Sequence, residues 1–164
     1  MLSEPQTDIL VKATLSSEYT PLIDSYDSRF VDLDALIEII LKSGKEGMNW
    51  DEIDELAAET AASFATMHPD YAYLSSRFAR RAMYRNTDPS MVVTAGILSE
   101  YVDPESKLHA PLIAPDTMDV IRRYGDIIDA KIDHQRDDNY DIFGLRTLQR
   151  SYLLKTYGKI TERP

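Results

Sequence analysis

Apolar residues repeat at helical spacing through most of this sequence, and this repeat restricts the chain to packed helices. The clearest stretch lies between Asp32, which can cap a helix, and Gly44, which can end one. Its apolar residues fall at positions i, i+3, i+4, i+7 and i+8, so they share one side of a helix. They are Leu33, Leu36, Ile37, Ile40 and Leu41. We therefore expect a mainly α fold.

Further helices follow along the chain. Asn49 and Glu52 have the spacing of a capping box, and Pro69 fits the first position of the next helix. Alanines at 57–58 and 61–62 would let a neighbouring helix approach closely. Other helices are expected near residues 91–101, from Pro115, and over residues 142–153. The residues expected to face inward are Tyr71, Leu74, Phe78 and Ala82 after Pro69, and Met118, Ile121, Tyr124 and Ile128 after Pro115.

The two ends of the chain depart from this pattern. Residues 1–29 are rich in Ser, Thr, Pro and Asp, which favours loops and turns, apart from a short strand expected at residues 9–11. Near the other end, Tyr157 and Gly158 fit a tight turn between two short extended pieces, residues 153–156 and 159–162. The expected fold is a compact helical domain with a short β-hairpin near its C-terminus.

Composition narrows the classes of partner. The chain has 164 residues, 28% of them charged, with a net charge of −10 at pH 7, which disfavours binding to nucleic-acid phosphates and to anionic membranes. It has no cysteine, which excludes disulfides, thiolate metal sites and thiol nucleophiles. No apolar run approaches the length of a membrane span, and residues 1–7 lack the pattern of a secretory signal. We expect a cytoplasmic protein with no nucleic-acid or membrane partner.

The histidines give little sign of a metal or catalytic site. None of the three, His68, His109 and His134, pairs with another at metal-ligand spacing. His68 most simply caps the helix after Pro69. His134 lies among charged residues and is either a catalytic acid–base group or, more simply, part of a hydrogen-bonded, solvated loop.

Charged rows lie on two successive helices. Asp51, Glu52, Asp54, Glu55 and Glu59 share the helix after Asn49, and a solvated acidic face is the simplest interpretation. A di-metal carboxylate site would need inward-facing Glu with Glu-x-x-His partners, which are absent. A basic row follows on the next helix, either as a phosphate-binding surface or as a solvated face that offsets the acidic helix. Its members are Arg77, Arg80, Arg81 and Arg85.

An ordered set of motifs resembles one family. Residues 56–61 (Leu-Ala-Ala-Glu-Thr-Ala), 68–72 (His-Pro-Asp-Tyr-Ala), 74–77 and 110–113 (Ala-Pro-Leu-Ile) are similar to the N-terminal region of the class I ribonucleoside-diphosphate reductase large subunit. The terminal block is the closest match, and the whole set covers about residues 30–164. Its matching residues are Arg136, Asp137, Tyr140, Phe143, Gly144, Thr147, Leu148, residues 150–154, Gly158, Lys159 and residues 162–164.

The resemblance implies a division into three segments. Residues 1–29 form a poorly patterned start. Residues 30–88 would be a degenerate ATP-cone, the small helical lid that binds ATP or dATP in this family. Residues 89–164 would be the helical segment that leads into a catalytic α/β barrel, which the chain does not contain.

The same resemblance implies candidate residues for contacting a nucleotide effector, and it implies partner proteins. The family's effector-contacting Asp is matched by Asp54 and its Lys by Arg85, whereas Trp50 replaces a Thr and the glycine and basic residues of the phosphate-wrapping hairpin are missing after Lys12. Asp54 and Arg85 are therefore the candidate contacts for an ATP or dATP effector, although Asp54 could equally be a solvated surface acid. Implied partners are the barrel-containing part of the large subunit and the radical-generating small subunit.

Two functions follow from these residues. The first is the N-terminal portion of the reductase large subunit, which serves deoxyribonucleotide synthesis for DNA replication. Because the family's radical chemistry needs cysteine, no catalytic residue or catalytic cofactor is assigned to this chain, and enzymatic activity of the chain alone is left open. The alternative is a non-enzymatic helical module, either an adenine-nucleotide sensor or an interaction domain. The sequence leaves open whether the chain is a split or truncated product or part of a longer sequence.

Overall fold

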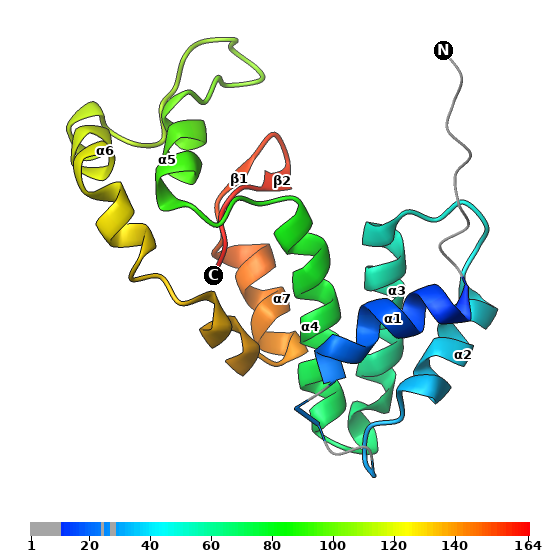
Figure 1. Ribbon diagram of the computed structural model, residues 1–164. Coiled ribbons are helices and arrows are strands. Elements are labelled where there is room, and N and C mark those ends of the chain that lie inside the picture. The colour runs from blue at the N-terminus through cyan, green and yellow to red at the C-terminus, as the bar shows by residue number, and fades with distance from the viewer. Residues whose placement is uncertain (1–10, 24, 27–28) are drawn as a thin grey trace. The chain divides into compact units, whose positions relative to one another are not determined.

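Helices dominate the structure, a computed structural model that describes residues 11–23, 25–26 and 29–164 (Figure 1). The mainly α class and the β-hairpin near the C-terminus are both confirmed. The α-helices are α1 (Lys12–Ile23), α2 (Leu33–Ser43), α3 (Trp50–Ser63), α4 (Asp70–Arg85), α5 (Met91–Ser99), α6 (Pro115–Asp129) and α7 (Ile142–Ser151). Two short 3₁₀ segments, η1 (Phe64–Thr66) and η2 (His134–Asn139), and the strands β1 (Lys155–Thr156) and β2 (Lys159–Ile160) complete the described elements.

The chain divides into two units. The first comprises Met1–Ala82 and Asp138–Leu145, and the second comprises Met83–Asp137 and Arg146–Pro164. The division falls inside α4, η2 and α7 rather than in a loop, so no change in composition marks it in the sequence. The boundaries at residues 29 and 88 rest on the family resemblance and stay predictions.

The helix α1 corrects the expectation for the N-terminal segment. Residues 12–23 were expected to form loops, yet they form a helix in which Leu15 and Tyr19 have no exposed surface. The two residues lie one turn apart, and tertiary burial overrides the weak local pattern, which includes Pro21 inside the helix. Val11 lies outside any strand, and the rest of the expected strand at residues 9–11 lies outside the described residues.

The caps expected for α2 and α3 are confirmed. The Asp32 side chain accepts a hydrogen bond from the Ala35 backbone N–H at 2.9 Å, and Gly44 ends α2. Asn49 and Glu52 form a reciprocal capping box at the start of α3. These caps fix where α3 begins, and therefore which of its residues point into the first unit.

Helices α3 and α4 pack closely through small residues, as the alanine pairs predicted. Ala57, Ala58 and Ala61 are buried on α3, and Ala79 is buried on α4. The Ser75 hydroxyl of α4 donates to the backbone carbonyl of Ala58 at 2.7 Å. The four residues expected to face inward from α4 (Tyr71, Leu74, Phe78 and Ala82) are all buried.

The second unit is built on the pair of α5 and α6. Ala95, Met118 and Ile121 form its buried core. The carboxylate of Asp129, the last residue of α6, accepts hydrogen bonds from the Met91 backbone N–H at 2.7 Å and the Ser90 hydroxyl at 2.6 Å. The end of α6 therefore caps the start of α5.

One inward-facing residue of α6 was predicted wrongly. Tyr124 is 48% exposed, whereas the next residue, Gly125, is buried against α5. Glycine lets the two helices approach so closely that no ring could fit between them. Val120 and Ile127 lie on the exposed side together with Tyr124.

The hairpin has the turn that its sequence predicts. Lys155 pairs with Ile160 and Thr156 with Lys159 in antiparallel register. Tyr157 and Gly158 have φ values of 53° and 78°, the left-handed conformation that a two-residue type I′ turn requires at both positions. None of the helices among the described residues is long and apolar enough to span a membrane.

Replacing Gly125 with alanine tests the close approach of α5 and α6. The added Cβ would overlap Cγ2 of Val92, and because valine is stiff at χ1, we expect Gly125→Ala to lower the free energy of unfolding by about 1–3 kcal/mol. Urea denaturation measures this loss, and Val92→Ala in the same chain should recover part of it.

Gly96 supplies the matched control. It lies in α5 with nothing within 4 Å of an added Cβ, so Gly96→Ala should leave stability unchanged or raise it by up to about 1 kcal/mol. Equal effects of the two substitutions would contradict the close packing at Gly125.

Candidate functional site

Asp54 lies inside the first unit rather than on its surface. The capping box at Asn49 starts α3 so that Asp54 turns inward beside Ile53, and the exposed fraction of Asp54 is 0%. The interpretation of Asp54 as a solvated surface acid is therefore wrong. A carboxylate in such a place needs hydrogen bonds and a counter-charge to offset its lost hydration.

Two side chains supply those interactions to Asp54. The Tyr19 hydroxyl of α1 donates to Oδ1 at 2.9 Å. The Arg81 Nε of α4 lies 3.4 Å from Oδ2. The carboxylate thus connects three helices, α1, α3 and α4, at one buried point.

Arg81 is itself held on several sides. Its guanidinium carbon lies 4.8 Å from the centre of the Trp50 ring and 5.5 Å from the centre of the Tyr19 ring. It donates to the Glu18 carbonyl at 3.2 Å and pairs with the Glu18 carboxylate. We call Glu18, Tyr19, Trp50, Asp54 and Arg81 the Asp54 cluster.

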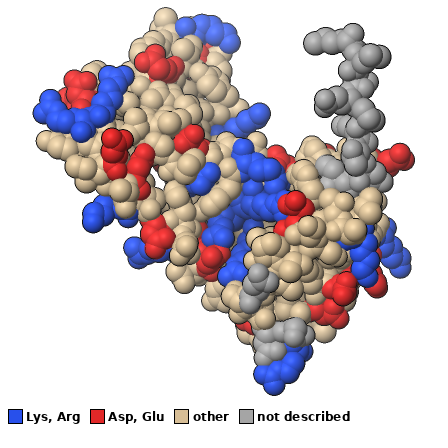
Figure 2. Space-filling view, viewed as in Figure 1, with Lys and Arg blue, Asp and Glu red and all other residues tan. Residues whose placement is uncertain are grey.

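The basic row on α4 binds carboxylates instead of facing solvent. Lys and Arg side chains gather over this helix (Figure 2). Arg77 and Arg80 both pair with Asp138, and their side chains are only 16% and 14% exposed. Arg77 also donates to the Leu22 carbonyl at 2.5 Å. The expectation of a solvated basic face is therefore wrong for these arginines, and the same pairing leaves little room for phosphate.

Arg85 has different surroundings from Asp54. It is the last residue of α4 and is exposed. It belongs to the second unit, whereas Asp54 belongs to the first. Because Asp54 and Arg85 lie in different units, a joint contact of their side chains with ATP or dATP stays a prediction.

His134 belongs to a hydrogen-bonded loop in the second unit. Its Nε2 lies 3.2 Å from the Pro89 carbonyl oxygen and its Nδ1 lies 3.9 Å from a carboxylate oxygen of Asp137. The Tyr84 hydroxyl donates to the same Asp137, which is buried. These contacts tie η2 to the end of α4, which matches the simpler of the two interpretations of His134.

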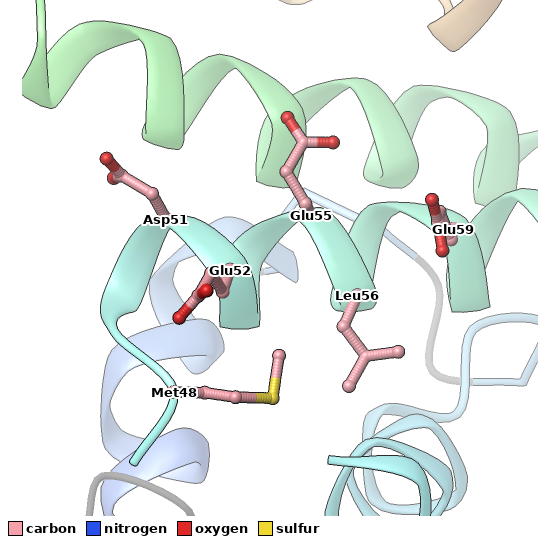
Figure 3. A pocket seen from close by; sticks show the side chains of 6 residues that line it. All are labelled: Met48, Asp51, Glu52, Glu55, Leu56 and Glu59. Atoms are coloured by element: carbon pink, nitrogen blue, oxygen red, sulfur yellow. The ribbon is translucent and has the colours of Figure 1, made fainter. Parts of the chain in front are cut away.

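The acidic residues of α3 other than Asp54 line a hollow of about 440 Å³ in the first unit. Figure 3 shows Asp51 and Glu55 pointing away from Met48 and Leu56, the two apolar residues of the lining. Glu52 and Glu59 complete the lining. No group of three or more metal-ligating side chains in the described residues could hold a metal ion.

The sequence is similar to several reductase subunits. The "ribonucleoside-diphosphate reductase large subunit" of Trypanosoma brucei brucei is 34% identical over 166 residues, which covers 98% of this chain and 19% of that protein. The Dictyostelium discoideum protein of the same name is 38% identical over 138 residues (84% and 16%). That of Arabidopsis thaliana is 43% identical over 119 residues (73% and 15%). No family model matches the sequence.

This chain belongs to the ribonucleoside-diphosphate reductase large-subunit family. It corresponds to the N-terminal portion of such a subunit and spans less than a fifth of the length of these relatives. The resemblance inferred from the ordered motifs is thereby confirmed.

The terminal motif of this reductase-family chain has a packing role in the second unit. The Arg163 guanidinium lies over the Tyr84 ring, 4.0 Å from its centre, and donates to the Thr87 carbonyl at 2.8 Å. The Glu162 carboxylate accepts a hydrogen bond from the Leu154 backbone N–H at 2.8 Å. The motif therefore ties the hairpin to the end of α4.

Sequence reasoning missed most of the Asp54 cluster. Glu18 and Tyr19 lay in the segment expected to be loop, and Trp50 was noticed only as a departure from the family. The usable signal was the spacing of Leu15, Tyr19 and Leu22 at i, i+4 and i+7, one side of a helix. With α1 recognised, the Tyr19 hydroxyl would have been a candidate partner for a buried acid.

Tyr26 gives a pH-dependent test of the first unit. Burial raises the pKa of its phenol, Arg77 opposes the rise in pKa, and Asp138 adds to it. A raised folded-state pKa means that the stabilisation is fully present below the unfolded pKa of about 10. It is lost as the pH rises through the folded pKa. We therefore expect Tyr26→Phe to reduce the alkaline loss of stability, as measured by denaturant unfolding from pH 9 to about pH 11.

Tyr124→Phe is the control for this titration, because Tyr124 is exposed and lies in the second unit. It should leave the alkaline dependence of the wild-type chain unchanged. Identical pH dependence in wild type and Tyr26→Phe would contradict the assignment.

Proposed function

We propose that this chain provides the N-terminal helical scaffold of a ribonucleotide reductase large subunit and works with a separate or attached barrel part. The observation that carries the proposal is identity of 34–43% over 73–98% of the chain to proteins named as that subunit. The substrate would be a ribonucleoside diphosphate, as the names of the relatives state.

The chemistry of the residues supports a scaffold role. Thiyl-radical reduction of a ribose needs cysteine sulfur, and this sequence has none. The reduction itself is therefore assigned to the barrel part, together with the radical-generating small subunit that the family resemblance implies. The same proposal includes the cytoplasmic location expected from the sequence.

Exposed apolar side chains near the C-terminus support a contact with the barrel part. Tyr152, just past the end of α7, is 71% exposed, and Leu154, before β1, is 44% exposed. Exposed apolar side chains mark a partner-binding surface when they lie together, and these two lie only two positions apart in the sequence. We propose that these two residues contact the barrel part.

ATP or dATP binding is implied by the family resemblance and is separate from the scaffold proposal. The front segment would act as an allosteric ATP-cone only if Asp54 and Arg85 contact the nucleotide together. That contact stays a prediction, and calorimetric titration of the chain with each nucleotide tests it.

Co-expression with the barrel-containing remainder of a related large subunit tests the scaffold role. We expect the two chains to co-purify, and CDP reduction to require both chains and a small subunit. Tyr152→Ser should weaken their association at least about tenfold, because a large buried aromatic contributes more than 1.4 kcal/mol to an interface. Affinity is measured by titration of one purified chain with the other.

Met67→Ser is the matched control, since Met67 is also 71% exposed but lies after η1 in the first unit. It should leave the affinity for the barrel part unchanged. If the wild-type chain bound no barrel part at all, the scaffold proposal would be wrong.

A further inference from the structure

Among the described residues, Tyr19 and Arg81 lie against the two oxygens of the Asp54 carboxylate. Oδ1 accepts from the Tyr19 hydroxyl at 2.9 Å, and Oδ2 lies 3.4 Å from the Arg81 Nε. Asp54 and Tyr19 both have exposed fractions of 0%. The contact at Oδ2 is an ion pair without a hydrogen bond, so burial, rather than a filled acceptor, keeps the hydroxyl or amine of a ligand away from this oxygen.

We infer that the Asp54 cluster is a closed latch that holds α1 on α3 and α4 and makes Asp54 unavailable to adenine nucleotides. The latch joins residues far apart in the sequence, because Tyr19 belongs to α1, Asp54 to α3 and Arg81 to α4. It lies wholly within the first unit. It does not depend on the association with a barrel part.

Arg81 makes the latch difficult to open from the α4 side. The Glu18 carboxylate and carbonyl bind its terminal nitrogens, and the rings of Trp50 and Tyr19 cover its guanidinium. A planar guanidinium can make all these contacts at once, which a lysine ammonium cannot. A nucleotide phosphate that attracted Arg81 would have to compete with a carboxylate already in place.

Opening the latch from the α1 side would expose the core. Tyr19 packs on Phe78 with ring centres 4.6 Å apart, and Leu15 one turn earlier has no exposed surface. If α1 moved away to admit a nucleotide, these side chains would be transferred to water. The closed arrangement is therefore the stable one.

Two readouts on the 164-residue chain test the latch. The first is thermal unfolding with millimolar ATP or dATP, and the second is amide hydrogen exchange of residues 12–23. We expect no saturable nucleotide-dependent rise in Tm for the wild type. We expect Asp54→Asn to lower the Tm by several degrees and to speed exchange in α1. A wild-type Tm that rises saturably with either nucleotide, with the rise abolished in Asp54→Asn, would overturn the inference.

Tyr19→Phe provides a milder variant if Asp54→Asn does not fold. It removes the hydroxyl that donates a hydrogen bond to the Asp54 carboxylate. Hydrogen exchange of the α1 amides should therefore speed up about tenfold. Glu59→Gln is the matched control, because Glu59 is an exposed carboxylate on the same helix, and exchange should stay at the wild-type rate. Wild-type exchange rates in Tyr19→Phe would also overturn the latch. Association with a barrel part is measured separately, so failure of either proposal is distinguishable from failure of the other.

Discussion

The burial of one carboxylate governs the first unit of this protein. Asp54 has no exposed surface, and among the described residues Tyr19 and Arg81 offset the cost of burying its charge. Breaking such a buried pair by removing one partner generally costs about 3–5 kcal/mol, a large part of the stability of a small domain. The helices α1, α3 and α4 therefore depend on one another, and α1 remains helical although its own sequence pattern is weak.

The need to pair a charge that is shielded from water also determines the contacts of the basic side chains of α4. Arg77 and Arg80 share the carboxylate of Asp138, and Arg81 pairs with Asp54 and Glu18. In a chain with a net charge of −10, half-buried arginines find carboxylates close by. Arg77, Arg80 and Arg81, three of the four residues of the basic row, thus form ion pairs instead of a free phosphate surface.

Local signals in the sequence predicted the local features well. Asp32, Asn49 and Glu52 cap their helices through their own side chains, and Gly158 satisfies a backbone requirement of the turn. The burial of Asp54 and the partners of Arg81 depend on residues 27 to 63 positions away, which no local pattern contains. Tyr124 was misplaced for a similar reason, since only the approach of α5 shows that Gly125 occupies the buried position.

The motif that best marks the family in α3 is a packing motif. Within residues 56–61, Ala57, Ala58 and Ala61 are buried, and the Thr60 hydroxyl donates to the Leu56 carbonyl at 2.7 Å. Small side chains are needed there because α4 approaches closely enough for Ser75 to bind the Ala58 carbonyl. Family membership is thus encoded here by residues that determine shape and carry out no chemistry. A chain without cysteine can keep every one of these packing residues. Its membership of the family therefore does not decide whether it takes part in the reaction.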